Sequence, residues 1–464
     1  MDRNCIIKID PEISFVDKPV DITIKGLHCN QKVILRAVSN DYYCINAGML
    51  EQGQQSVWES YGTFMSDANG NLSLKDTAPI EGTYQGCDAM GLFYSMKIRQ
   101  KYQVNPPKSL FEVRENRSFH ILFTVEVDGE ILTSINHIRY FCDDSIISQT
   151  IVKEGLVARY FTSGVIKKRP AVIVVSGSEG RIEIAQAIAE ILAQRGYSAL
   201  GICYFGMEGT SPNLTRIPIE IIENAIKWLK DQESVDETRI GIYGRSKGGE
   251  LVLAAASLLP DLTCVIANTP SCYVYEGLKN NIPSRQSSWT YGGKELPYLK
   301  FSVSTLLRLV IKKVQGQKNL IHWMYQQLIE HGNTERASIA VERINGPILF
   351  LSSKADSIWP SYLHSETAET RLWKKEFQYS HKHYTYEKAG HMLTLPYQSI
   401  PNLKKWNVNL SEWGQACLNS WKQTTDFLDN WSHSNSSQDM YKEKKLLLER
   451  QETIDESNSH FGQP

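Results

Sequence analysis

The stretch Ile240-Gly241-Ile242-Tyr243-Gly244-Arg245-Ser246-Lys247-Gly248 decides the fold of this chain. It opens with a short β run, continues into Gly-x-Ser-x-Gly, and is followed by a helical pattern over residues 250–259. A serine between a strand and a helix in this pattern lies on a turn so sharp that a side chain at either glycine would clash, and the strained turn exposes its hydroxyl. The stretch therefore predicts a nucleophilic Ser246 above the end of a parallel sheet.

Buried strands and amphipathic helices alternate on both sides of this motif. The expected strands and helices lie at residues 171–175, 182–193, 198–202, 217–230, 240–243, 250–259, 263–267 and 347–352. This rhythm predicts an α/β fold, with a parallel sheet covered by helices on both faces. A turn-rich and then helical, polar stretch interrupts it at about residues 268–344, and we expect this insertion to form a cap over the site.

The region before Asp143 has the pattern of an all-β domain. Short runs with period-two alternation occur at residues 6–9, 20–24, 33–37 and 121–127. Residues 67–71, Asp-Ala-Asn-Gly-Asn, supply the positive-φ residues that a tight hairpin needs. These patterns predict a β-sandwich.

The chain is therefore expected to divide into three parts. The β-sandwich domain covers residues 1–143, and the α/β domain covers residues 144–431. Residues 432–464 form a polar tail that we expect to be frayed, with one segment, 442–450, that could form a peripheral helix. A length of 464 residues fits two or three such units, because one hydrophobic core rarely serves so long a chain.

Composition excludes several classes of partner. The chain has 50 Lys and Arg against 51 Asp and Glu and no long basic run, so nucleic acid is not an expected partner. It has neither a signal-peptide pattern nor a stretch long and apolar enough to span a bilayer, so we expect a cytoplasmic protein with no membrane partner. Nine cysteines without C-x-x-C spacing indicate neither a disulfide framework nor a zinc site. No cofactor or metal is expected, and the pattern does not indicate the oligomeric state.

A serine nucleophile needs a general base, and the base needs an orienting carboxylate. In this kind of fold the chain order is serine, acid, histidine. Asp356 directly follows the expected strand at residues 347–352, where the sites of open α/β sheets lie, and it is the candidate acid. The alternative for Asp356 is a simple helix N-cap, and the nearby Glu366 would fall on the following helix.

His391 is the candidate base. Ala389-Gly390-His391 follows a strand-like run at residues 384–387, so a loop there could bring the imidazole over Ser246. The alternative for His391 is a structural role, packed against its neighbours. His381 and His383 precede that strand in a polar stretch, where we expect solvated surface positions, and they remain alternative bases.

Acyl transfer also needs N–H donors aimed at the oxyanion of the tetrahedral intermediate. The backbone N–H of Lys247, directly after the nucleophile, is the first candidate. The second should come from the loop Ser176-Gly177-Ser178-Glu179-Gly180, with Ser178 or Glu179 as the donor. Neither G-K-[S/T] nor G-x-G-x-x-G accompanies this loop, so nucleotide binding is not favoured.

With these residues placed, the chain resembles the family of acyl-CoA thioesterases and bile acid-CoA:amino acid N-acyltransferases over about residues 5–430. Residues 82–96, Gly-Thr-Tyr-Gln-Gly-Cys-Asp-Ala-Met-Gly-Leu-Phe-Tyr-Ser-Met, are similar to the first-domain signature of that family. Ser246-Lys247-Gly248-Gly249-Glu250 resembles its nucleophile motif, and Ala389-Gly390-His391 its base. Residues 355–361 are similar to the acid segment of bacterial members.

The resemblance implies an immunoglobulin-like first domain, an α/β-hydrolase fold and hydrolysis of acyl-CoA to a fatty acid and CoA through an acyl-enzyme, without a metal. The amino-acid-conjugating branch has a cysteine nucleophile, so Ser246 resembles the hydrolytic branch. Ser178-Glu179 departs from the usual run of glycines, which leaves the second oxyanion donor open. Acyl transfer to an amine, carboxylesterase or peptidase activity, and a binding protein with an inactive hydrolase domain are the alternatives.

Overall fold

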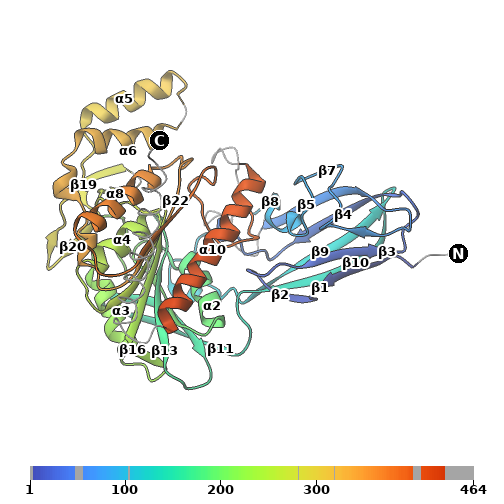
Figure 1. The fold of residues 1–464 in the computed structure, drawn as a ribbon, viewed down its shortest axis with the longest axis horizontal. Helices are drawn as coiled ribbons and strands as arrows, with labels where there is room; N and C mark the ends of the chain where they lie inside the picture. Colours follow the sequence, from blue (N-terminus) through green and yellow to red (C-terminus); the bar gives the residue numbers. More distant parts are fainter. Residues whose placement is uncertain are drawn as a thin grey trace, which may run out of the picture.

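The computed structural model describes residues 4–46, 56–102, 105–280, 282–317, 319–400 and 409–433. Figure 1 shows an all-β region, blue to cyan, beside a larger α/β region that carries the rest of the chain. The long helix α10 (Leu410–His433) runs along the α/β region on the side that faces the all-β region. The predicted fold class, an α/β fold preceded by an all-β domain, is confirmed.

The all-β region consists of two sheets. The smaller has the order β1-β3-β6, and the larger has the order β2-β10-β9-β4-β5-β7, with β8 pairing with β5. Apart from β2 with β10, the neighbouring strands are antiparallel. The elements are β1 (Ile6–Asp10), β2 (Ile13–Phe15), β3 (Asp21–Lys25), β4 (Lys32–Ser39), β5 (Ser56–Met65), β6 (Leu72–Ser73), β7 (Glu81–Gly82), α1 (Gly91–Tyr94), β8 (Lys97–Lys101), η1 (Leu110–Glu112), β9 (Ser118–Val127) and β10 (Glu130–Tyr140).

The turn at residues 67–71 is not the hairpin that the sequence predicts. The turn itself is present, since Asp67 Oδ1 accepts the N–H groups of Asn69 and Asn71 at 2.8 Å each and Gly70 has a φ of 76°. The strand before it pairs with β4, however, and the strand after it pairs with β3. The prediction was wrong because turn residues set the local backbone, whereas the two apolar faces decide which sheet the next strand joins.

The α/β region is built on an eight-stranded sheet with the order β11-β12-β14-β13-β16-β17-β22-β23. The six strands from β14 to β23 are parallel, which confirms the five predicted parallel strands and adds β23 to them, whereas β11 and β12 are antiparallel additions at one edge that the sequence did not predict. The strands are β11 (Ile146–Lys153), β12 (Leu156–Ser163), β13 (Arg169–Val175), β14 (Ser198–Cys203), β16 (Val235–Arg245), β17 (Leu262–Asn268), β22 (Ile348–Ser353) and β23 (His381–Tyr386).

Two apolar cores sandwich this sheet. Val172 and Val174 of β13 point into a core shared with α2 (Ile182–Gln194), α10 and the all-β region. The alternate residues Ile173 and Val175 point into a second core with α3 (Glu220–Lys230), α4 (Lys247–Ala256) and α8 (Ser361–Lys374). The all-β region therefore rests on one face of the α/β unit.

Two helix starts differ from the predictions. Ile217–Pro218 form a short strand, β15, which pairs with β20, so α3 begins only at Glu220. Helix α4 begins at Lys247, three residues earlier than predicted. Gly248 and Gly249 have low helix propensity, so the sequence did not indicate this first turn, but the turn at Ser246 holds them in the helix. The nucleophile therefore lies directly against a helix N-terminus.

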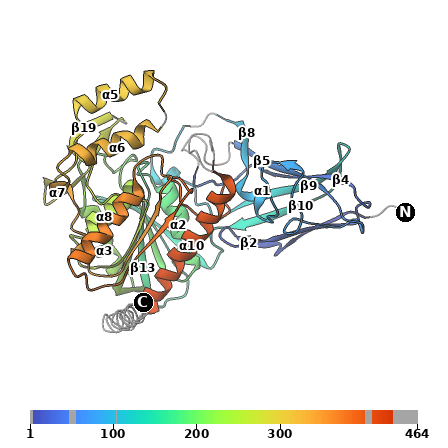
Figure 2. The ribbon, with the colours of Figure 1, turned by 45° about the horizontal axis from the view of Figure 1, so that its top comes forward.

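The insertion between β17 and β22 is not a plain loop, because it has strands and helices of its own. It contains β18 (Glu276–Lys279), β19 (Ile282–Ser287), β20 (Trp289–Tyr291), β21 (Lys294–Glu295), α5 (Val303–Val314), α6 (Leu320–His331), α7 (Thr334–Ala337) and η2 (Val341–Arg343). In Figures 1 and 2, α5 lies outermost and α6 lies between it and the remainder of the α/β region. The sequence predicted a turn-rich part followed by helices. The helices are present, and the turn-rich part forms the short strands β18 to β21.

Helix α10 ends at His433, two residues into the predicted tail. Ser432, just past the predicted boundary, is itself buried, and its carbonyl oxygen accepts a hydrogen bond from Arg239, so the last turn still packs on the α/β region. The remaining tail, with the predicted helix at residues 442–450, lies outside the described residues. Within the described ranges, no helix has both the length and the apolar character needed to cross a membrane.

Candidate active site

Ser246 lies on a strained turn between β16 and α4. Its φ of 57° and ψ of −119° fall outside the regions that most residues with a side chain adopt. A Cβ at Gly244 would lie 2.3 Å from the carbonyl oxygen of Gly248, and one at Gly248 would lie 2.0 Å from that of Ser176. Both glycines are therefore required sterically, and the turn presents a half-buried Ser246 at the carboxyl end of the sheet.

Three of the predicted residues form a continuous line of hydrogen bonds. His391 Nε2 lies 2.8 Å from Ser246 Oγ, and His391 Nδ1 lies 2.8 Å from Asp356 Oδ2. The Asp356 and His391 residues are only 3% and 5% exposed. An Nδ1 proton donated to Asp356 leaves Nε2 free to accept the proton of Ser246. The arrangement can therefore activate the hydroxyl as a nucleophile.

Asp356 is held by a second set of contacts. Its Oδ1 accepts the N–H groups of Ile358 at 2.9 Å and Trp359 at 3.2 Å. The following helix α8 begins only at Ser361, so Asp356 is not the simple N-cap that the sequence left as an alternative. Glu366 lies on α8 and accepts a hydrogen bond from Tyr362 at an exposed position.

Asn268 and Trp359, which the sequence did not indicate, support the hydrogen-bonded line of Ser246, His391 and Asp356. The carbonyl oxygen of Asn268 accepts the Ser246 N–H at 2.8 Å, and Asn268 Nδ2 donates to the carbonyl oxygen of Leu393 at 3.0 Å. Asn268 thus ties the serine turn to the loop of His391. The Trp359 ring lies edge-on to His391, with ring centroids 5.9 Å apart. Asn268 ends an apolar parallel strand, which is the same signal that identified Asp356.

The side chain of Lys247 is buried, which no sequence pattern indicated. Its Nζ lies 2.7 and 2.8 Å from the two carboxylate oxygens of Glu250. Glu250 Oε1 also accepts the Nε1–H of Trp289 at 2.8 Å and the N–H of Tyr275 at 3.2 Å. Burial lowers the pKa of Lys247 and raises that of Glu250, since both charged forms lose hydration. The pair fastens the insertion to the first turn of α4.

The glycine-containing loop approaches the nucleophile closely. A Cβ at Gly177 would lie 3.3 Å from the Cβ of Ser246, and the Gly177 carbonyl oxygen accepts a hydrogen bond from the buried Tyr204 hydroxyl. Ser178 is exposed, and the Glu179 carboxylate pairs with Arg245 at 3.1 Å. The structure thus places the loop that carries Ser178 and Glu179 against the turn of Ser246 and Lys247.

His381 and His383 are not the solvated residues that the sequence predicts. Both lie in β23, and the His383 side chain is only 7% exposed. Its Nε2 lies 2.7 Å from Ser352 Oγ, and its Nδ1 lies 3.4 Å from Glu369 Oε2. The prediction was wrong because α8 covers this edge strand, which a polar sequence does not reveal. His381 is half-buried and contacts the rings of Trp373 and Phe377.

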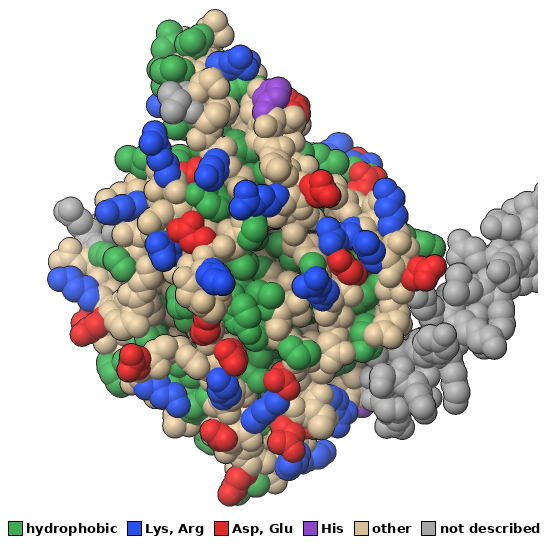
Figure 3. Space-filling model, turned by 90° about the vertical axis from the view of Figure 1, so that its left-hand side faces the viewer, with side chains coloured by type: hydrophobic (Ala, Val, Ile, Leu, Met, Phe, Trp, Pro, Cys, Tyr) green, Lys and Arg blue, Asp and Glu red, His purple; other side chains and the backbone are tan. Residues whose placement is uncertain are grey.

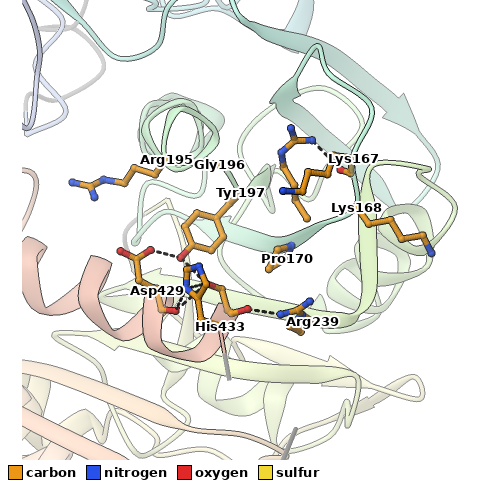
Figure 4. Close-up of a pocket in the computed structure, with 11 residues that line it drawn as sticks. Lys167, Lys168, Pro170, Arg195, Gly196, Tyr197, Arg239, Asp429 and His433 are labelled. Atoms are coloured by element: carbon orange, nitrogen blue, oxygen red, sulfur yellow. Dashed lines mark hydrogen bonds between the residues drawn. The ribbon is translucent and has the colours of Figure 1, made fainter. Parts of the chain in front are cut away.

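A separate cavity of about 380 Å³ lies at the amino ends of the strands, away from Ser246. Figure 4 shows Lys167, Lys168 and Arg239 at its margin, with Tyr197 donating to Asp429. Its cations do not face the proposed nucleophile, so it is not part of this site. In the described part of the chain, His, Cys, Asp and Glu side chains nowhere form a group of three or more that could hold a metal ion.

The comparisons with known proteins agree with the geometry. The family model for the N-terminal region of acyl-CoA thioester hydrolase/BAAT matches residues 17–153, and the model for its C-terminal region matches residues 217–433. Acyl-coenzyme A thioesterase 1 of Mus musculus is 25% identical over 82% of this chain and 83% of its own length. Peroxisomal succinyl-coenzyme A thioesterase of Mus musculus is 24% identical over 89% and 93%.

Solved structures are similar to this chain at lower sequence identity. An alpha/beta hydrolase enzyme from a deep-sea metagenome library covers 63% of this chain and 100% of its own, with 15% identity and a TM-score of 0.41. An esterase of Pyrococcus furiosus covers 62% and 93%, with 16% identity and a TM-score of 0.38. The two family models fall on the two structural regions in chain order. The chain belongs to the acyl-CoA thioester hydrolase/BAAT family, where BAAT denotes bile acid-CoA:amino acid N-acyltransferase.

Proposed function

We propose that this chain hydrolyses acyl-CoA thioesters to a free carboxylic acid and CoA through an acyl-enzyme on Ser246. The observation that carries the proposal is the line from Asp356 through His391 to Ser246, with both hydrogen bonds at 2.8 Å on a strained strand-to-helix turn. Relatives that carry thioesterase names over most of their length support the thioester as substrate.

The first half of the reaction forms the acyl-enzyme. His391 Nε2 takes the Ser246 proton while Oγ attacks the thioester carbonyl carbon, and Asp356 stabilises the imidazolium that forms. The backbone N–H of Lys247 and one N–H of the Ser178–Glu179 loop hold the oxyanion. The intermediate then breaks its C–S bond, and the CoA sulfur leaves with the proton carried by His391.

The second half returns the enzyme to its starting state. His391 accepts a proton from water, and the resulting hydroxide attacks the ester carbonyl of the acyl-enzyme. Collapse of this second intermediate breaks the bond to Oγ, releases the carboxylic acid and returns the proton to Ser246. The start of α4 at Lys247 favours both oxyanions, because the positive end of its dipole points at them.

Product analysis tests this function. The enzyme is incubated with acetyl-, octanoyl-, palmitoyl- or succinyl-CoA, with and without glycine or taurine, and free thiol and acyl products are measured. We expect thiol and free acid in equal amounts, unchanged by the amine, and no reaction by Ser246→Ala. An N-acyl amine as the main product would instead establish acyl transfer, the second reaction of this family. Hydrolysis of oxyesters alone would contradict the thioester assignment.

The proposal also assigns the parts of the chain. Residues 1–143 form the β-sandwich domain and residues 144–431 the catalytic domain, a division supported by the family regions 17–153 and 217–433. The insertion at about residues 268–344 caps the site, which is supported by the contacts of Tyr275 and Trp289 with Glu250. Limited proteolysis with mass spectrometry of the fragments tests this division, and a first cut near residue 143 is the expected result.

We further propose a cytoplasmic location. All nine cysteines lie in the described ranges and none of them forms a disulfide there, which fits a reducing compartment. The names of relatives include mitochondrial and peroxisomal forms, so fractionation of cells that express the chain is the relevant test. Recovery in an organelle fraction would contradict the proposal.

A further inference from the structure

Helix α5 carries an exposed apolar stripe. Leu307, Val310, Ile311 and Val314 follow the i, i+3, i+4, i+7 spacing of one helix face, and they are 62%, 60%, 55% and 84% exposed. Figure 3 shows hydrophobic side chains gathered at the tip of the molecule, where α5 lies. Aliphatic side chains at this spacing normally face a core, so a continuous exposed stripe marks a surface that contacts something else.

The stripe is not needed to fold the insertion. The other side of α5 packs on α6, where Leu306 and Leu309 are half-buried. Lys312 Nζ lies 5.0 Å from the centre of the Trp323 ring and 2.7 Å from Gln317 Oε1. These contacts fix the helix with its apolar stripe pointing outward.

The charges around the stripe have one sign. Residues 296–329 contain four lysines and one arginine but no aspartate or glutamate. At 100° per residue, Arg308 lies on one side of the stripe and Lys313 on the other, and both are exposed. Long cationic side chains beside an apolar stripe can extend toward negative headgroups while their stems stay on the apolar surface.

We infer that α5 is a docking face for an anionic lipid surface, with the apolar stripe inserted at the headgroup boundary and Arg308 and Lys313 on lipid phosphates. This combination of apolar stripe and cationic margins is the arrangement of interfacial helices. A second copy of the chain fits the stripe poorly, because two such faces would bring like charges together. The inference departs from the sequence expectation of no membrane partner, and it concerns peripheral contact and not a membrane span.

The docking face is linked to the catalytic side of the molecule. Tyr325 of α6 contacts the Trp359 ring at a centroid distance of 5.5 Å, and Trp359 contacts His391 at 5.9 Å. Docking through α5 would therefore hold the carboxyl end of the sheet near the lipid. The inference itself does not depend on the reaction, so it can fail while the proposed function holds.

Co-sedimentation with vesicles tests the inference. The full chain is mixed with vesicles of phosphatidylcholine alone or with about one third phosphatidylglycerol, in about 0.1 M or 0.5 M salt. We expect binding to the anionic vesicles only, weakened by salt. Val310→Asp with Val314→Asp should weaken it at least about tenfold, since two aliphatic groups no longer enter the boundary. Arg308→Gln with Lys313→Gln should weaken it about fivefold for each cation removed.

Two matched controls separate this face from the remaining surface. Phe111→Asp with Ile131→Asp changes two apolar residues that are 73% and 63% exposed in the all-β region, and it should leave binding unchanged. Lys167→Gln with Lys168→Gln removes two exposed cations at the amino ends of the strands and should also leave it unchanged. Circular dichroism confirms that each variant folds.

Three outcomes would overturn the inference. One is the absence of binding to anionic vesicles, or equal binding to phosphatidylcholine alone. Another is binding that the α5 variants leave intact or that the lysine control abolishes. The third is a dimer in analytical ultracentrifugation without lipid that the Val310 and Val314 changes dissociate, which would assign the stripe to a second copy of the chain.

Discussion

The Nζ of Lys247 lies 2.7 Å from Oε1 and 2.8 Å from Oε2 of Glu250, and both side chains are buried in the helix turn that follows the proposed nucleophile. Glu250 also accepts the N–H groups of Tyr275 and Trp289, so one carboxylate joins α4 to the insertion. The backbone N–H of Lys247 is the proposed oxyanion donor. The pair therefore links the shape of the insertion to the part of the site where negative charge develops.

Glu250→Ala should destabilise the protein by about 3–5 kcal/mol, because it leaves a buried ammonium without its partner. Lys247→Met with Glu250→Leu should recover most of this loss, since an apolar pair of similar volume avoids the unpaired charge. Urea unfolding of the three proteins measures both effects. A double variant as unstable as Glu250→Ala would show that the remaining contacts of Glu250, and not the charge pair, govern stability here.

Asp356→Asn should lower kcat by about 10⁴ while the protein stays folded. The amide oxygen can still accept the N–H groups of Ile358 and Trp359, but the amide nitrogen cannot accept the Nδ1 proton of His391. Steady-state kinetics and thermal unfolding of the variant check both halves of the prediction. Glu366→Gln, which changes the exposed carboxylate on α8, is the control and should retain wild-type turnover.

Gly248→Ala should disrupt the nucleophile turn, because its Cβ would lie 2.0 Å from the carbonyl oxygen of Ser176. Gly414→Ala is a matched control in α10, where the nearest atom to the new Cβ is 3.8 Å away. The control should stabilise the protein by up to about 1 kcal/mol, since alanine is the better helix former. Thermal unfolding and turnover of both variants provide the comparison, and full activity in Gly248→Ala would contradict the close packing at this turn.

Glu190 should make stability depend on pH. Burial raises its pKa from the ordinary 4.5 to about 8, and its Oε1 accepts the N–H of Asn116 at 3.2 Å. Between these pH values the folded state keeps the proton that the unfolded state loses, so the free energy of unfolding falls as pH rises, by about 1.4 kcal/mol per unit. The stabilising contribution is full below pH 4.5 and is lost as pH approaches about 8.

Glu190→Gln removes the titrating carboxyl group but keeps an amide oxygen that can accept the N–H of Asn116. The stability of the variant relative to the wild type should therefore increase steadily from about pH 5 to about pH 8. Urea unfolding across this range measures the difference. Parallel stability curves for the two proteins would mean that Glu190 titrates alike in the folded and unfolded states.

Local chemistry made the core of the site predictable. Gly244, Ser246 and Gly248 form a motif whose steric demands fix the turn, and Asp356 follows a short apolar run bounded by turn residues, which is the pattern of a buried strand. His391 followed from its place in a loop after a strand-like run, since His381 and His383 satisfy the same chain order of serine, acid and base. Five of the six parallel strands could be predicted because each contains a short, mainly apolar run bounded by turns, whereas β23 has a polar sequence.

The features that the sequence did not predict depend on tertiary contacts. Strand β11 buries only Ile146 and Ile151 and pairs at a sheet edge, so no continuous buried run identifies it. His383 is polar in sequence but is covered by α8. Lys247 and Glu250 look like a solvated i, i+3 pair until the insertion closes over them. In the last two cases the covering residues come from a separate element of the chain, where a local pattern carries no information, whereas β11 pairs with the neighbouring strand β12.

Two measurements made together test the central claim most directly. One is the turnover of acyl-CoA by Ser246→Ala, and the other is the mass of the wild-type protein quenched during turnover. The wild type should carry one acyl group on the peptide that contains Ser246, and the variant should carry none, with kcat reduced by about 10⁶. An unmodified wild-type protein together with near-wild-type turnover by Ser246→Ala would show that the nucleophile lies elsewhere.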